Sequence, residues 1–302
     1  MTPEQILDHP ATVLTQAQRE QYFTQGFLIL EGIIPPRWVA RLREATDALI
    51  ERSRAVTRPD AIWDLEPGHG RDDPRLRRVS NPVEQHPAFW DYVSDSFLVD
   101  VVADLLGPDV KFHHSKLNFK WARGGTEVKW HQDIPFWPHT NYSPLTVGTY
   151  IHDCASEQGP VGFVPRSHDG PIYDHYDTSG KWVGCISDAD ARRAGVERAV
   201  YAVAPAGSIT IHNSRTIHGS QPNVSDLGRP LILYTLSCAD AFPYTVNPIR
   251  SKYDQSIVRG HAARHAHHDA RPCLLPPDWS GGYTSIFALQ QQEGSQAAGG
   301  MM

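Results

Sequence analysis

Hydrophobic residues recur with a helical period in the first third of the chain and with a strand-like period after it. Pro35-Pro36 opens a segment that runs to Arg52 and keeps apolar residues on one side, as an amphipathic helix does: Val39, Leu42, Ala45, Leu49 and Ile50. Thr15 can cap a shorter helix through about Thr24, and Ser94 to Leu106 predicts a third helix that Gly107-Pro108 ends. The part of the chain from residue 1 to about 107 is therefore expected to be helical.

Strand signals alternate with turn signals from Lys111 to Leu236, apart from a helix expected near Asp188 to Gly195. Helices first and strands afterwards indicate a mostly β fold with flanking helices, namely an antiparallel two-sheet jelly roll of the cupin-like, double-stranded β-helix type. We expect a single domain over residues 1–289, with its core at about 108–240 and a C-terminal extension over 241–289. Residues 290–302, rich in Gln, Gly, Ser and Ala, are expected to be disordered.

Composition narrows the class of protein without naming one. The 302 residues, 40% of them hydrophobic, can bury a sizeable core, and barrels of this length commonly form one domain. A net charge of −6 and the lack of a concentrated Lys/Arg run argue against nucleic-acid binding. No apolar run approaches the roughly 18 residues of a membrane span, and no secretory signal opens the sequence. Four widely spaced cysteines indicate free thiols, so we expect a cytoplasmic protein. We also expect a monomer or a homodimer.

Three His-x-Asp triplets are candidates for metal binding, and roughly one is expected by chance. The triplets are His131-Gln132-Asp133, His175-Tyr176-Asp177 and His267-His268-Asp269. Only the first lies among β-branched and aromatic residues, from Thr126 to Phe136, that favour a strand. On a strand, residues i and i+2 point to the same face, so His131 and Asp133 would project together. The other two triplets have the composition of turns and polar loops, where solvated histidines are expected.

A second histidine could come from either of two short apolar stretches. His212 ends one and His218 ends the other, and each could face a pocket. His218 is followed by Gly219-Ser220, small residues that let the backbone approach a ligand, and Arg229 opens the next predicted strand. Two imidazoles and one carboxylate on one side of octahedral iron(II) leave positions for a chelating acid and O2. The guanidinium of Arg229 offers two parallel N–H donors, which suit the carboxylate of the chelating acid that lies away from the metal. The pattern therefore indicates an iron(II) and 2-oxoglutarate site.

These motifs resemble the characteristic blocks of the phytanoyl-CoA dioxygenase family. The blocks are Trp130-His131-Gln132-Asp133, residues 159–168, residues 217–223 and Gly228-Arg229-Pro230. The likeness runs from about Phe23 to about Leu236. It implies His131, Asp133 and His218 as iron ligands and Arg229 as the partner of the distal 2-oxoglutarate carboxylate. It further implies cosubstrate contacts by Ser220, Asn118 and Tyr150.

The resemblance also implies a reaction. With iron(II), 2-oxoglutarate and O2, such an enzyme oxidises a C–H bond of a small or medium organic substrate and releases succinate and CO2. Asp133 fills the position that related halogenases leave for chloride, which favours hydroxylation. Side chains expected near the substrate are Phe136, Trp137, His212, Lys116 and His114, although simple core packing would equally explain Phe136 and Trp137. A cupin-like metalloenzyme without 2-oxoglutarate and a non-catalytic small-molecule-binding jelly roll stay open as alternatives, and the substrate is not defined.

Overall fold

Two antiparallel β-sheets form the centre of this computed structural model, which describes residues 1–282 and 285–290. The larger sheet has the order β1 (Phe27–Leu30), β9 (Ile209–Asn213), β6 (Leu145–Thr149), β11 (Arg229–Cys238), β4 (Val110–Lys120), β3 (Leu76–Ser80) and β2 (Trp63–Leu65), with β12 (Ile257–Arg259) beside β4. The smaller sheet has the order β5 (Val128–His131), β10 (His218–Ser220), β7 (Val161–Phe163) and β8 (Val200–Tyr201). The expected mostly β fold with flanking helices is confirmed, although the part before residue 107, expected to be helical, also contributes β1, β2 and β3 to the larger sheet.

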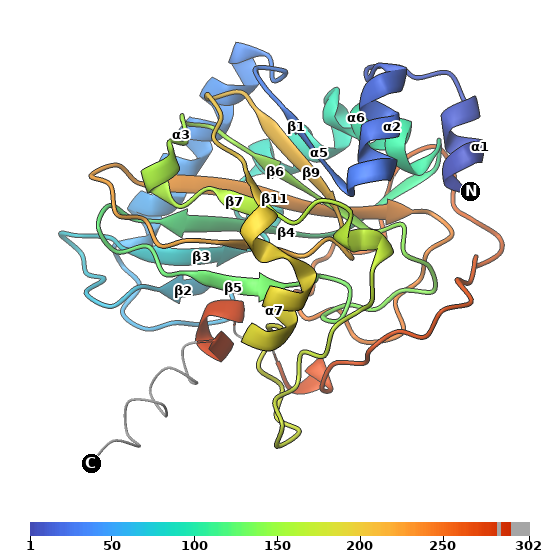
Figure 1. The fold of residues 1–302 in the computed structure, drawn as a ribbon. Helices are drawn as coiled ribbons and strands as arrows, with labels where there is room; N and C mark the ends of the chain where they lie inside the picture. The colour runs from blue at the N-terminus through green and yellow to red at the C-terminus, as the bar shows by residue number, and fades with distance from the viewer. Residues whose placement is uncertain (283–284, 291–302) are drawn as a thin grey trace.

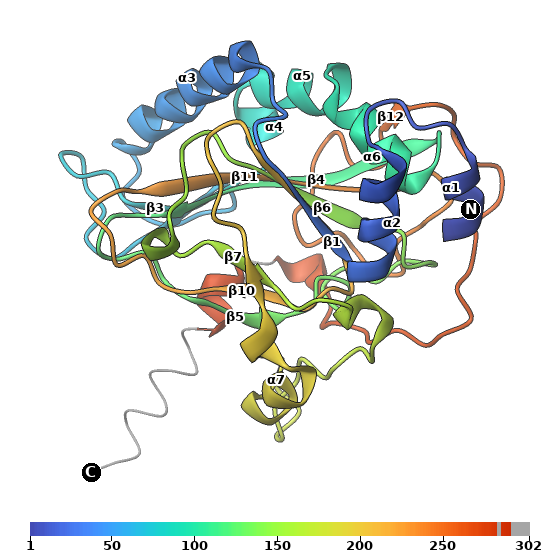
Figure 2. The same ribbon diagram turned by 45° about the horizontal axis from the view of Figure 1, so that its top comes forward.

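Helices cover one face of the larger sheet, and the smaller sheet lies against the other face (Figures 1 and 2). The covering helices are α3 (Pro36–Ser53), α4 (Pro82–Gln85), α5 (Pro87–Asp95) and α6 (Leu98–Leu106). Beside them lie α1 (Pro3–Asp8) and α2 (Gln16–Gln25), whereas α7 (Asp188–Ala194) lies beyond the smaller sheet. Four short 3-10 turns occur at Ser156–Gln158, Ser167–Asp169, Val196–Arg198 and Trp279–Gly281 among the described residues. No described helix has both the length and the apolar character of a membrane span.

Local sequence signals account for three of these helices. Thr15 caps α2, since its hydroxyl accepts a hydrogen bond from the Gln18 backbone N–H at 3.2 Å and the Gln18 side-chain oxygen accepts one from the Thr15 backbone N–H at 2.8 Å. The helix α3 begins at Pro36 as predicted and buries Val39, Leu42, Ala45 and Leu49 against the larger sheet. The helix near Asp188 is confirmed as α7.

The single helix predicted from Ser94 to Leu106 is wrong, because two helices meet there. The chain is extended at Ser96, which ends α5. The Ser96 hydroxyl donates to the Tyr92 carbonyl at 2.6 Å and accepts from the Leu98 N–H at 3.1 Å, so one side chain ends one helix and starts the next. The first helix also begins earlier than predicted, at Pro87.

The strand predicted from Thr126 to Phe136 is shorter than expected. It ends at His131, and residues 134–136 form a turn. The backbone N–H groups of Asp133 and Ile134 both donate to the Ser214 carbonyl at 2.9 Å, which draws the chain out of the sheet toward the loop after β9. Asp133 therefore reaches the interior from a turn, not from a strand.

The C-terminal extension packs back onto the region around Phe136. Trp279, Ile286 and Phe287 form a buried cluster with Phe136 and neighbouring aromatic residues. Gln290, assigned by its sequence to the tail, is buried: its side-chain oxygen accepts from the Lys129 N–H at 2.9 Å and its amide donates to the Gly184 carbonyl at 3.0 Å. The disorder expected for the rest of the tail falls on residues 291–302, outside the described residues.

Candidate metal centre

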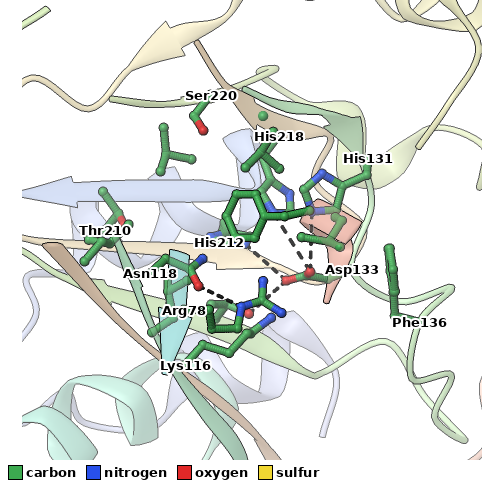
Figure 3. Close-up of a pocket in the computed structure, with 18 of the residues that line it drawn as sticks. Arg78, Lys116, Asn118, His131, Asp133, Phe136, Thr210, His212, His218 and Ser220 are labelled. Carbon is green, nitrogen blue, oxygen red and sulfur yellow. Dashed lines mark hydrogen bonds and ion pairs between the residues drawn. The ribbon is translucent and has the colours of Figure 1, made fainter. Parts of the chain in front are cut away.

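Two imidazoles and one carboxylate meet between the two sheets. His131 ends β5 and lies directly opposite His218, the first residue of β10, with ring centroids 4.2 Å apart. Asp133 Oδ1 lies 3.9 Å from Nε2 of each histidine (Figure 3). All three side chains are buried, and they are the only group of three potential ligands found among the described residues. Strand pairing thus brings together the histidines that the motifs singled out.

Both histidines are oriented by the backbone two residues before them. Nδ1 of His131 lies 2.9 Å from the Lys129 carbonyl oxygen, and Nδ1 of His218 lies 3.0 Å from the Thr216 carbonyl oxygen. A carbonyl only accepts, so each Nδ1 carries the proton. Each Nε2 lone pair is consequently left for a metal, the arrangement usual for metal-ligating histidines.

The protonation states of the three groups also suit a cation. Burial lowers the pKa of His131 to about 4, although Asp133 opposes this shift. The pKa of His218 falls well below its usual value because of burial and the neighbouring His131. Burial alone would raise the pKa of the Asp133 carboxyl, but His218, His212 and Lys116 together hold it well below its usual value. At neutral pH the centre offers two neutral imidazoles and one carboxylate, which is the donor set that iron(II) takes in non-haem oxygenases.

The second oxygen of Asp133 has its own partners. The Thr146 hydroxyl donates to Asp133 Oδ2 at 2.9 Å, and His212 Nε2 lies 3.4 Å from the same oxygen. The Thr146 hydroxyl also lies 3.2 Å from the Thr235 hydroxyl, which in turn lies 3.3 Å from His114 Nε2. This chain of polar groups leaves Oδ1 facing the two histidines.

Neither of the other His-x-Asp triplets belongs to the group of metal ligands, and one differs from expectation. His267 and His268 are exposed, as predicted for a polar loop. His175, expected to be solvated, is fully buried, and its Nε2 accepts a hydrogen bond from the Gln132 N–H at 3.1 Å. It supports the backbone between His131 and Asp133, a role that requires contacts the local sequence does not reveal.

A cavity with a free volume of about 80 Å³ adjoins the metal centre. Among the residues expected to bind the cosubstrate, Arg229, Ser220 and Asn118 line it. Arg229 is 3% exposed, and its Nη2 donates to the Gly159 carbonyl at 3.0 Å, whereas its Nε has no partner among the described residues. Tyr150 is not among the lining residues and lies fully buried in a cluster with Phe163 and Leu231.

Four of the five residues expected near the substrate also line this cavity: Phe136, Trp137, His212 and Lys116. His114 does not, because its ring packs edge-on against Trp137, with centroids 5.7 Å apart, and its Nε2 faces Thr235. His114 therefore supports the wall from behind and does not belong to its surface.

Sequence reasoning missed part of the cavity wall. Arg78, on β3, lines the cavity and donates through Nε to the Asn118 side-chain oxygen at 2.9 Å. Ile249, Ile286 and Phe287 of the C-terminal extension also line it. No local signal marked Arg78, since its strand also carries Arg77 and Ser80. Nothing local to residues 249–287 indicates contact with the metal centre either.

Comparison with known proteins identifies the family. The sequence profile described as Phytanoyl-CoA dioxygenase (PhyH) matches residues 22–231. The chain belongs to this family. It is 30% identical over 276 residues, 91% of this chain and 96% of its relative, to the "Probable alpha-ketoglutarate-dependent hypophosphite dioxygenase" of Stutzerimonas stutzeri. The resemblance drawn from the motifs is therefore confirmed.

Further relatives agree with this assignment. The L-proline trans-4-hydroxylase of Streptomyces griseoviridis is 28% identical over 255 residues, 77% of this chain and 89% of that protein. The crystal structure of EctD from S. alaskensis with 2-oxoglutarate and 5-hydroxyectoine superposes with a TM-score of 0.65 at 20% identity and covers 89% of this chain and 93% of that chain. At that identity the structural likeness concerns the fold alone, while the sequence relatives confirm the class of enzyme.

Proposed function

We propose that this chain, an iron(II)- and 2-oxoglutarate-dependent dioxygenase, hydroxylates a small molecule held in the cavity beside His131, Asp133 and His218. The convergence of these three side chains, with Nε2, Nε2 and Oδ1 all facing one point, is the observation that carries the proposal. A buried arginine with an unpartnered Nε in the same cavity supports 2-oxoglutarate as the cosubstrate over a cupin-like reaction without it.

The protein's own residues provide position and a dry environment. His131, Asp133 and His218 would hold the metal, and Arg229 with Ser220 would bind the distal carboxylate of 2-oxoglutarate. Iron(II) with this cosubstrate and O2 supplies an oxidant able to break an unactivated C–H bond, with release of succinate and CO2. Phe136, Trp137 and the apolar residues of the C-terminal extension would exclude water and fix which bond of the substrate faces the metal.

We also propose that the two sheets are those of a jelly roll and that residues 1–289 act as one domain. The C-terminal extension supports this, because Ile249 and Phe287 line the same cavity as the metal ligands. A cytoplasmic location is supported by the free cysteines Cys154, Cys238 and Cys273, since a reducing compartment keeps thiols free and iron ferrous.

Anaerobic titration tests the proposed activity. Addition of Fe(II) and then 2-oxoglutarate to the apoprotein is expected to produce a weak visible charge-transfer band, and air should then give slow succinate formation. Arg229→Ala should raise the 2-oxoglutarate concentration needed for the band by about ten- to hundredfold, since a hydrogen-bonded charged pair is lost. Arg229→Lys keeps the charge but loses the two-pronged geometry of the guanidinium. The 2-oxoglutarate concentration that it needs should lie between those of the unaltered chain and of Arg229→Ala. No band and no succinate from the unaltered chain would exclude the proposal.

A further inference from the structure

Two cationic side chains of the cavity wall have unused hydrogen-bond donors. Arg78 is 2% exposed, and only its Nε has a hydrogen-bond partner among the described residues, the Asn118 oxygen. Its guanidinium lies over the Phe287 ring, 5.2 Å from the centroid, which fixes its position. Lys116 lines the same cavity, and no described residue forms a hydrogen bond or ion pair with its ammonium group. Both side chains extend toward the space beside Asp133 (Figure 3).

The other two cations of the cavity wall have partners, one within the protein and one in the proposed cosubstrate. The Lys120 ammonium donates to the backbone carbonyls of Thr126, Ser220 and Gln221. Arg229 donates to the Gly159 carbonyl and, under the proposed function, binds the distal carboxylate of 2-oxoglutarate. Buried cations are normally paired or fully hydrogen-bonded, so the contrast singles out the buried Arg78 and the part-buried Lys116.

The charges of the metal, Arg229, Asp133 and the cosubstrate balance one another, so none of them is left to neutralise Arg78 and Lys116. Iron(II) and Arg229 carry three positive charges, and Asp133 with doubly charged 2-oxoglutarate carries three negative ones. Arg78 keeps its charge at any physiological pH, and an added like charge from Lys116 is unfavourable in a low dielectric. An anion between Arg78 and Lys116 would offset this repulsion and accept hydrogen bonds from their unused N–H groups.

Lys116 lies apart from Arg229, whereas Arg78 lies between them beside Asn118, which is also expected to contact the cosubstrate. Lys120 pairs with Arg229 across β4 and β11, and Lys116 lies four residues further along β4, about 13 Å along the strand. Arg78 pairs with Asn118 on the neighbouring strand, diagonal to Lys116. In Figure 3, Ser220 and Lys116 lie at opposite ends of the group of side chains. The cations are therefore placed for a second ligand.

We propose that Arg78 and Lys116 form the anion-binding end of the substrate site, and that the substrate is a small molecule held by an oxyanion such as a carboxylate or phosphorus oxyanion. The inference rests on the proposed function, because it assigns the metal and Arg229 to 2-oxoglutarate.

Binding of two anionic probes tests this assignment. Hypophosphite represents a free oxyanion and L-proline an organic carboxylate; each is titrated anaerobically into protein loaded with Fe(II) and 2-oxoglutarate. Saturable binding is followed by calorimetry and by the shift of the visible band. We expect at least one probe to bind, and Lys116→Met and Arg78→Met to weaken it by about ten- to hundredfold each. Which probe binds distinguishes the free oxyanion from the organic carboxylate, and L-prolinamide, without the carboxylate, should not bind.

Three controls keep the outcomes distinct. Lys111→Met removes a buried lysine of the same strand, β4. Its Nζ lies over the Phe242 ring at 3.8 Å, outside the cavity, so this change should leave probe binding unchanged. Lys116→Arg should preserve binding, which guards against misfolding of the methionine variant. Loss of 2-oxoglutarate affinity in Lys116→Met, or a normal band with no binding of either probe, would overturn the anion site. Absence of the band in the unaltered chain would instead refute the proposed function.

Discussion

At the scale of single residues, the orientation of Asp133 depends on one hydroxyl. Thr146 donates to Oδ2 at 2.9 Å and so helps to keep Oδ1 toward His131 and His218. Partners of metal ligands commonly contribute about ten- to hundredfold to metal affinity. The Thr146 hydroxyl is thus a positioning group for the metal centre, although it does not face the metal itself.

Thr146→Val removes this hydroxyl with little change of volume. We expect affinity for Fe(II), or for Co(II) as a stable substitute, to fall about tenfold or more, since Asp133 can then rotate. Competition with a chromophoric chelator measures the effect. Thr149→Val alters the same strand on its opposite face and should leave metal affinity unchanged. Equal affinities of the two variants would show that Thr146 does not position Asp133.

The sequence predicted the site residues that stand in short motifs, and it missed those whose role depends on contacts with distant parts of the chain. His131, Asp133 and His218 stand in short motifs, and the structure brings all three together. Arg78 could not be predicted, because its role comes from Asn118, forty positions away on the neighbouring strand. A site residue that stands in a short motif can be predicted from one sequence. A cavity wall formed by several strands cannot, because its residues come together only through the register of the sheet.

At the scale of elements, the same limit explains where boundaries were wrong. The apolar composition of residues 134–136 favoured a strand, yet two N–H groups bonded to the Ser214 carbonyl turn the chain inward. Ser96 divides a helical pattern because its hydroxyl serves two backbone groups at once. Tertiary hydrogen bonds of this kind override local propensity, which fixes the type of an element better than its ends.

The loop before β7 makes a specific prediction at this scale. Gly159 has φ +64°, and an added Cβ would lie 2.2 Å from the Gln221 carbonyl oxygen, so Gly159→Ala must move the loop whose carbonyl holds Arg229. We expect weaker 2-oxoglutarate binding, by about tenfold, as Arg229 loses its anchor. The 2-oxoglutarate dependence of the visible band measures it. Gly180→Ala has the same backbone strain, at φ +80°, but open space around the Cβ, so it should not alter cosubstrate binding.

At the scale of the whole molecule, the cavity joins segments that are distant in the chain. Arg78 comes from β3, the metal ligands from β5, β10 and the turn after β5, and Phe287 from the C-terminal extension. The sequence predicted the layered class of the fold from the order of helices and strands. It could not assign the C-terminal extension to the site, because the hydrophobic pattern of this segment does not show that Ile249 and Phe287 line the cavity.

Buried histidines set an acid limit for the fold. Burial lowers the pKa of His113 to about 3, and it lowers those of His114 and His139 well below the ordinary value. In the unfolded chain these groups titrate near 6.5. Below that pH the unfolded state binds more protons than the folded state, so the free energy of unfolding falls as pH falls, by about 1.4 kcal/mol per pH unit for each histidine. The loss continues down to the folded pKa values, near pH 3 for His113.

Urea unfolding of the apoprotein between pH 7.5 and 4.5 should therefore show a steep loss of stability below pH 6.5. His139→Phe should make that loss shallower by about 1.4 kcal/mol per pH unit, even if it shifts the overall stability, because one buried site no longer resists protonation. His261→Gln alters a histidine whose side chain is 94% exposed and should leave the slope unchanged. A flat free energy of unfolding from pH 6.5 to 4.5, or equal slopes for the two variants, would mean that the cluster around His113 accepts protons in the folded state.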